Sequence, residues 1–220
     1  RGGGGGGGGA PTGHDRPKSR GALEEADPVL VACGISTARG VRADKRRKLA
    51  QVRAFVRLAE EALKAAQGGG QLRAAPEGSP LRVVDLGCGN AALSFASYRA
   101  LGELAGRSLE LVGVDVKAQA REHNTRVAKE LGWEESVRFE EGTIAGAEPS
   151  FTRGPGGGGD PEVVLALHAC DTATDEALAR AVRWRSPVVL SAPCCHHELQ
   201  QQLGRQGAEG GAHPPLLRHG

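Results

Sequence analysis

The stretch VVDLGCGNAALSFA (Val83–Ala96) joins a short apolar run to an aspartate, two glycines and the start of an amphipathic segment. The apolar run is typical of a buried strand, and the residues after the glycines are typical of a helix. Gly87 and Gly89 allow a tight turn between the two and a close approach of a ligand to the backbone. We therefore expect a strand, a glycine turn and a helix whose free N–H groups favour a polar or anionic group.

The same alternation continues along the chain. Four further short runs, rich in Val and Leu, lie at residues 109–116, 137–142, 163–169 and 187–193, and helical patterns separate most of them. A long amphipathic segment at residues 44–66 precedes them all. Because the apolar runs are continuous rather than alternating, they suit parallel strands that are buried on both faces. The predicted fold class is α/β, with a Rossmann-like, doubly wound and mostly parallel sheet.

Two carboxylates mark the ends of the first two expected strands. Asp85 precedes the glycine turn, and Asp115, the fifth residue of LVGVDV, lies at the end of the second expected strand. A glycine turn followed by a strand-end carboxylate is a nucleoside-binding pattern, and the nucleoside could belong to NAD or to S-adenosylmethionine (SAM). The third glycine of a dinucleotide site is replaced by Ala92, and a carboxylate at Asp85 would repel a pyrophosphate but suit an ammonium group. This favours SAM; the alternative is that both aspartates are helix caps or solvated strand ends.

Four other stretches accompany VVDLGCGNAALSFA: GVDVKAQAREHN, EEGTI, LALHACDTATDEAL and LSAPCCHHEL. Together they resemble the class I SAM-dependent methyltransferase domain of one methyltransferase-like family, which includes the glutathione-S-transferase-C-terminal-domain-containing protein. The likeness runs from about Lys45 to Leu203, and HACDTATD and PCCHHEL are its most specific parts. The resemblance implies a SAM-dependent methyltransferase whose acceptor is RNA or a protein.

The resemblance also implies roles for single residues. The methionine part of SAM would be held by Asp85, Gly87 and Gly89, and the ribose by Asp115. The adenine would be flanked by Thr143 and Ile144, and His168 would lie near the transferred methyl group.

The glycine turn departs from the family pattern at two positions. The family usually has Lys and then Gly after the second glycine of the turn, whereas this chain has Asn90 and Ala91. The methyl group of Ala91 narrows the turn, which bears on the affinity for the cofactor.

The motifs HACDTATD and PCCHHEL follow the fourth and fifth expected strands. Because ligands of open α/β sheets bind at the carboxyl ends of the strands, we expect both motifs to line one acceptor pocket beside the cofactor. In that pocket His196 or Asp171 would orient the acceptor or take its proton. His168, from the resemblance, completes the set of candidate catalytic residues.

Three other interpretations of these motifs remain open. Zinc could be bound by the six candidate ligands His168, Cys170, Cys194, Cys195, His196 and His197. Adjacent cysteines fit the usual spacing of zinc ligands poorly, so we predict no metal. A thiol nucleophile is disfavoured because methyl transfer from a sulfonium needs no covalent intermediate. The last possibility is that the thiols are simply buried and apolar.

Composition limits the remaining choices. The chain has 220 residues, a net charge of +2, five cysteines and no methionine. No apolar run is long enough to span a bilayer, and the cysteines lack the spacing of a disulfide scaffold, so we expect no membrane partner and a reducing, cytoplasmic location. The densest basic run, Lys45–Lys48, is interpreted as a solvated helix face in preference to an RNA contact.

The predicted domains are a disordered glycine-rich segment at residues 1–40, a methyltransferase domain at 41–203 and a truncated glycine-rich tail at 204–220. The missing methionine and the ending PPLLRHG suggest a fragment, with the strand near Val188 left at the edge of the sheet. The alternatives to an active enzyme are a catalytically weak, methyltransferase-like binding module and a zinc-stabilised interaction domain.

Overall fold

The computed structural model describes residues 23–72, 78–152, 158–167, 169 and 171–192. Its centre is a sheet of five parallel strands in the order β5-β4-β3-β6-β7. The strands are β3 (Leu81–Leu86), β4 (Leu109–Asp115), β5 (Val137–Glu141), β6 (Val163–Ala166) and β7 (Val188–Ser191). The chain builds outward from β3 to β5, then returns to the other side of β3 with β6. This confirms the predicted α/β class and its doubly wound, parallel sheet.

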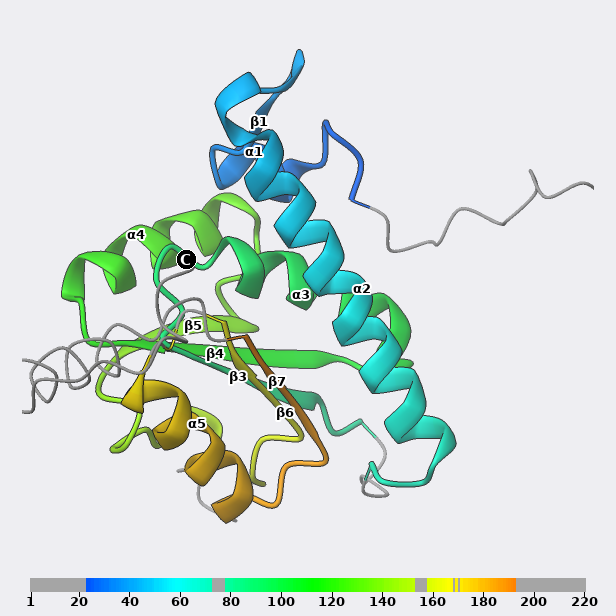
Figure 1. The fold of residues 1–220 in the computed structure, drawn as a ribbon, viewed down its shortest axis with the longest axis vertical. Coiled ribbons are helices and arrows are strands. Elements are labelled where there is room, and N and C mark those ends of the chain that lie inside the picture. Colours follow the sequence, from blue (N-terminus) through cyan, green and yellow to red (C-terminus); the bar gives the residue numbers. More distant parts are fainter. Residues whose placement is uncertain (1–22, 73–77, 153–157, 168, 170, 193–220) are drawn as a thin grey trace, which may run out of the picture.

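Helices cover both faces of the sheet. Figure 1 shows α2 (Arg46–Gly68), α3 (Ala92–Ala105) and α4 (Ala118–Glu130) on one face and α5 (Thr172–Arg183) on the other. Alternate residues of the strands pack on the two faces: Val83 and Leu111 belong to the larger apolar cluster, under α2, α3 and α4. Val84 and Val112 belong to the smaller cluster, with Ala177 and Ala181 of α5. Burial on both faces explains why the strands read as continuous apolar runs.

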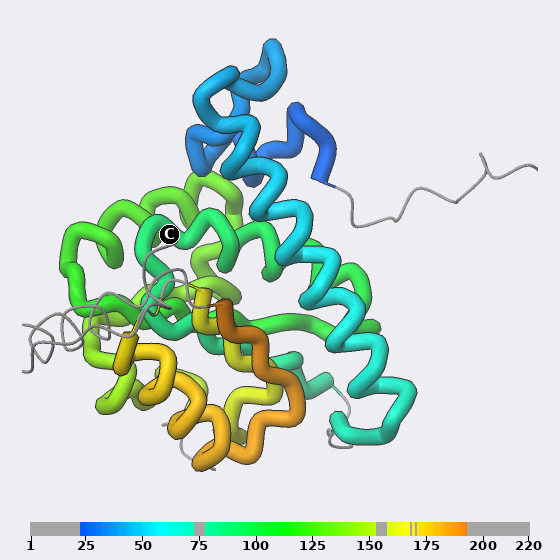
Figure 2. Tube along the Cα trace, viewed as in Figure 1, coloured from blue at the N-terminus to red at the C-terminus, as the bar shows by residue number. Residues whose placement is uncertain are grey.

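The predicted disorder of residues 1–40 is wrong for residues 23–40. This part forms α1 (Pro28–Ala32) and a hairpin of β1 (Ser36–Thr37) and β2 (Gly40–Val41), followed by the short helix η1 (Ala43–Lys45). Leu30 is fully buried, and Asp27 accepts a hydrogen bond from Val29 N (2.9 Å) at the start of α1. The glycine run is confined to the first residues, whereas this segment contains apolar side chains that dock it on the domain. The tube in Figure 2 shows it packed above α3 and α4.

The link between β5 and β6 contains the short helix η2 (Ser150–Thr152). Phe151 of η2 is buried in the smaller apolar cluster, which anchors this connection to the sheet. None of the helices in the described part of the chain has the length and apolarity needed to cross a membrane.

Candidate active site

The turns that follow β3 and β6 meet at the carboxyl edge of the sheet. Because β3 and β6 are neighbours whose connections lead to opposite sides, this is the switch point where ligands of such sheets bind. Gly87 has a φ of 75°, and a Cβ at this position would lie 3.6 Å from Ala169 N in the turn after β6. The left-handed conformation is what favours glycine here, because a Cβ would make only an ordinary van der Waals contact with the other turn.

Gly89 is held by two side chains distant in sequence. Its N–H donates to Asp115 Oδ2 (2.9 Å), and its carbonyl oxygen accepts from Asn124 Nδ2 (2.8 Å). Asp115 ends β4 and Asn124 lies on α4, where its side chain is fully buried. The glycine turn is thus fixed by the next strand and helix of the chain, so its shape does not depend on local glycine geometry alone.

Asp115 is half-buried, and both of its carboxylate oxygens already accept backbone hydrogen bonds. The second bond comes from Lys117 N to Oδ1 (3.0 Å). An ionised carboxylate oxygen has two acceptor sites, so each oxygen can still accept a hydrogen bond from a ligand hydroxyl. The side chain can therefore serve a ribose and the glycine turn together; its bond to the turn was not part of the prediction.

Asp85 is the one strongly perturbed carboxylate among the described residues. The residue is 2% exposed, Ser94 Oγ donates to Oδ2 (2.5 Å), and Oδ1 has no hydrogen-bond partner within the described part of the chain. The pKa of Asp85 is raised to about 7, mainly by burial; the hydrogen bond from Ser94 lowers it in part, and the charge of Asp115 adds to the rise. A buried carboxylate with an unused oxygen is stabilised in its ionised form by a cationic partner.

Cys88 lies beneath the turn and acts as an apolar filler. Burial raises the pKa of its thiol well above the ordinary value, with the charges of Asp85 and Asp115 adding to the effect, so the thiol stays protonated. Gly113 of β4 makes room for it, because a Cβ there would lie 3.0 Å from Cys88 Sγ and 2.6 Å from the Phe139 ring. Cys88 is therefore unsuited to act as a nucleophile.

The segment after β5 supplies the candidate adenine contacts. The Cδ1 atom of Ile144 lies 3.7 Å from the position of a Cβ on Gly87, so this side chain borders the glycine turn. Thr143 is exposed, and its Oγ1 accepts a hydrogen bond from Gly146 N (3.1 Å). The structure thus brings Ile144 to the site directly and Thr143 to its rim.

Of the candidate catalytic residues, Asp171 lies within the described residues, whereas His168 and His196 lie outside them. Asp171 precedes α5 with a φ of 56° and a ψ of −131°, and its side chain does not cap the helix. It lies two residues beyond Ala169, which borders Gly87. A non-glycine residue in such a backbone conformation is strained, and strain of this kind is concentrated at functional sites.

Two residues of the site were missed from the sequence. Ser94, on the first turn of α3, bonds Asp85, and Asn124 bonds the glycine turn. Asn124 occupies the apolar stripe of α4, since the buried residues of that helix are Asn124, Val127 and Ala128. A polar residue at a stripe position was the signal that could have found it, because buried amides need partners.

The site combines the glycine turn, which we call the ligand nest, with two carboxylates, of which Asp85 is buried and Asp115 is half-buried. The unused oxygen of Asp85 fits a cation, and Asp115 fits hydroxyl groups. The N-cap of α3 is Ala91, which has no side-chain acceptor for the first N–H groups of the helix. These residues fit the amino-acid and ribose parts of a nucleoside cofactor.

Comparison with protein families gives a match over most of the chain. The family model described as "Methyltransferase domain" matches residues 47–202, which include the whole sheet and the helices α3, α4 and α5. Comparison with curated protein sequences gives no match.

Solved structures of methyltransferases are similar at low identity. A methyltransferase from Geobacter sulfurreducens is 18% identical, over 84% of this chain and 83% of its own, with a TM-score of 0.44. A geranyl diphosphate methyltransferase in complex with SAM is 18% identical over 59% of this chain (TM-score 0.39), and a geranyl diphosphate C-methyltransferase from Streptomyces coelicolor is 14% identical over 64% (TM-score 0.40). This chain spans 44% and 45% of the lengths of the last two. Because these identities and TM-scores are low, the assignment to a family rests on the family model alone.

Proposed function

This chain belongs to the methyltransferase domain family, and from that premise we propose that it transfers the methyl group of SAM to an RNA or a protein. The observation that carries the choice of cofactor is Asp85, whose buried carboxylate keeps one oxygen without a partner in the described part of the chain, at the start of the glycine turn. The ammonium group of a methionine moiety is the cation that such an oxygen suits.

The residues of the site then divide between the parts of the cofactor. Asp85 binds the ammonium group, Gly87 and Gly89 admit the methionine backbone, and Asp115 accepts hydrogen bonds from the ribose hydroxyls. When bound, SAM supplies an electrophilic methyl group with its own leaving group. The protein therefore needs mainly to align the acceptor and to exclude water.

The acceptor side of the site is proposed from the turn after β6 and from the residues beyond β7. Asp171, together with His168 and His196, would orient the acceptor and take a proton where the acceptor must lose one. An acceptor such as a ribose hydroxyl needs that proton transfer, whereas an amine can lose its proton after the methyl group has moved. The proposed setting is the cytoplasm, in keeping with the cysteine usage.

The test has two measurements. Isothermal calorimetry is expected to show saturable binding of SAM. Incubation with methyl-labelled SAM and fractionated RNA and protein from cells of the same source is expected to label one macromolecular fraction, which ribonuclease or protease treatment then identifies. Absence of saturable SAM binding would contradict the proposal.

A binding module without turnover is the second candidate, and the conformation of Ala91 favours it. Ala91 has a φ of 52°, in the left-handed region where the family usually places glycine, so the turn is strained before a ligand binds. Saturable SAM binding without transfer to any fraction would support this candidate. The proposed zinc-stabilised domain depends on cysteines and histidines that lie outside the described residues; within those residues no group of metal ligands is assembled.

A further inference from the structure

Cationic side chains are concentrated in one part of the molecule, formed by the β1–β2 hairpin, η1 and the first half of α2. Between Arg39 and Arg57 the sequence has eight Lys and Arg residues against a single acid, Asp44. The whole chain has a net charge of only +2, so the remainder is net negative. A polyanion is therefore attracted to this segment and not to the molecule as a whole.

Six of these cations form what we call the basic surface: Arg39, Arg42, Lys45, Arg46, Arg47 and Arg57. The other two are excluded because they are engaged elsewhere. Arg53 donates two hydrogen bonds to Leu23 O (3.0 and 2.7 Å), and Lys48 is half-buried, with a pKa lowered by that burial. Asp44 pairs with Arg42 and Lys45 at the exposed surface, so it offsets one of the six charges.

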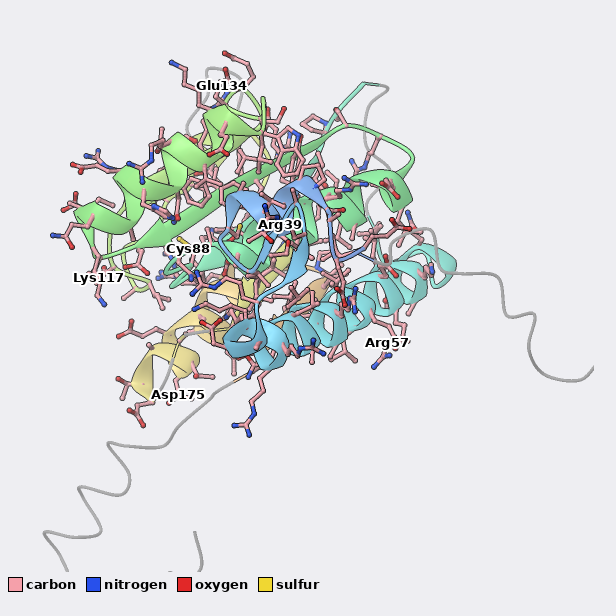
Figure 3. All side chains as sticks on the ribbon, turned by 90° about the horizontal axis from the view of Figure 1, so that it is seen from above. Arg39, Arg57, Cys88, Lys117, Glu134 and Asp175 are labelled. Atoms are coloured by element: carbon pink, nitrogen blue, oxygen red, sulfur yellow. The ribbon has the colours of Figure 1, made fainter. Side chains whose placement is uncertain are left out.

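The basic surface is open to solvent and extends over the hairpin, η1 and the first half of α2. Arg46 and Arg57 lie about three helical turns apart, which places them on the same side of α2. The apolar stripe of this helix, which includes Val52, Val56 and Leu63, is buried against the domain. Figure 3 shows Arg57 pointing away from the body of the domain and Arg39 on the hairpin.

The basic surface lies toward the same end of the domain as the candidate active site. α2 packs against α3, and both helices begin on the side where the strands of the sheet end (Figures 1 and 3). α3 begins directly after the glycine turn. A long ligand held by the start of α2 can therefore reach the site without crossing the sheet.

The composition of the surface selects among polyanions. Five of its six cations are arginines, whose planar guanidinium groups form paired hydrogen bonds with phosphate oxygens. A membrane surface would need a broad exposed apolar face beside the charges. Among the described residues from Gly34 to Gly68, the one large apolar side chain that is exposed is Leu58.

We propose that the basic surface binds the sugar–phosphate backbone of RNA and so holds an RNA acceptor beside the candidate active site. The second clause rests on the proposed methyltransferase function, whereas the first does not. Because the contacts are to phosphates, binding is expected to depend weakly on sequence and strongly on salt.

The test is fluorescence anisotropy of a short fluorescein-labelled oligouridine with the full chain, over a series of salt concentrations. The variant is Arg46→Gln with Arg57→Gln; the control, Lys129→Gln with Arg183→Gln, removes the same charge from exposed positions on α4 and α5. The first variant is expected to bind roughly tenfold more weakly at about 50 mM salt, and the slope of log K against log salt should become shallower by about 1.4. The control is expected to bind like the unmodified chain.

Several outcomes would contradict the proposed RNA binding. Equal weakening by both variants, or binding without salt dependence, would overturn the proposal, as would binding to vesicles containing phosphatidylserine in the absence of RNA binding. SAM calorimetry on the same samples separates the two proposals. RNA binding without SAM binding supports the basic surface and contradicts the proposed function, whereas SAM binding without RNA binding contradicts the basic surface alone.

Discussion

The carboxylate of Asp115 accepts a hydrogen bond from the backbone N–H of Gly89 at 2.9 Å, which ties the end of β4 to the glycine turn after β3. The two residues are distant in sequence, but Gly89 follows β3 and Asp115 ends β4, and these neighbouring parallel strands pair from Leu81↔Leu109 to Leu86↔Val114. The register of the sheet therefore decides that this carboxylate reaches the turn. One side chain thus shapes the ligand nest and also supplies acceptors to the ligand.

We predict that Asp115→Ala lowers the affinity for SAM at least about tenfold, because a charge-assisted hydrogen bond contributes about 1.5–3 kcal/mol. Calorimetry with SAM is the measurement. The control is Glu141→Ala, since Glu141 is the register partner of Asp115 at the end of β5 and is exposed. Asp115→Asn keeps one oxygen for Gly89 and should have an intermediate effect. Unchanged affinity in Asp115→Ala would place the ribose elsewhere.

Asn124→Ala is expected to destabilise the protein by about 1–3 kcal/mol and to weaken SAM binding. The substitution removes the donor to the carbonyl of Gly89 and leaves that partly buried oxygen without its partner. Denaturant unfolding gives the stability and calorimetry gives the affinity. Thr125→Ala, at the next and exposed position of α4, should stay within about 0.5 kcal/mol. A loss of stability with full SAM affinity would show that Asn124 supports the fold without shaping the nest.

The sheet and its helices could be predicted from the sequence because their signals are local. The five apolar runs and the amphipathic segments correspond to β3–β7 and α2–α5 within a few residues at each end. The parallel pairing of consecutive strands such as β6 and β7 agrees with the predicted doubly wound class. The segment at residues 23–40 was missed because its packing partner, α3, lies far along the chain: Asp27 pairs with Arg99 of that helix (3.4 Å).

The site could be predicted in part, for a related reason. Asp85, Gly87, Gly89 and Asp115 lie at strand ends, where the sequence pattern marks them. The hydrogen-bond partners of these residues lie on helices and carry no such sequence mark. Bonds such as Ser94 to Asp85 and Asn124 to Gly89 depend on how the helices pack on the sheet. Sequence periodicity places a residue on a face, but not against a particular atom.

Ala91→Gly is expected to leave stability within about 1 kcal/mol of the unmodified protein, although it removes a buried methyl group. Release of the left-handed strain at φ 52° gains about 1–2 kcal/mol. The lost methyl group and the greater freedom of the unfolded chain cost a similar amount. Ala96→Gly, at a fully buried position inside α3, has no strain to release and should cost roughly 2 kcal/mol. Denaturant unfolding of both variants measures the difference; equal costs would mean that Ala91 is not strained.

Asp85→Asn is expected to change how stability depends on pH. The pKa of Asp85 is raised from 3.8 to about 7 by burial in the folded protein, so the folded state holds this proton more tightly than the unfolded state. The stability that this difference contributes is present in full below about pH 4 and is lost as the pH rises toward 7. This difference in pKa corresponds to about 4 kcal/mol of stability at most. Because asparagine cannot ionise, the variant should gain stability relative to the unmodified protein as the pH rises from 4 to 8.

The same carboxyl group should make SAM binding depend on pH, in the opposite sense. A cationic group binds the ionised form, so below pH 7 the affinity of the unmodified protein should fall by up to about tenfold per unit as Asp85 is protonated. In Asp85→Asn the affinity should be lower at pH 8 and should vary little across this range. Ser94→Ala provides the matched perturbation: it removes the hydrogen bond that lowers the pKa of Asp85, so the pH at which affinity falls should move upward. If SAM affinity is flat between pH 5 and 8 in the unmodified protein, Asp85 does not bind the cation, because a buried carboxyl that titrates near neutrality cannot bind a charged group without releasing its proton.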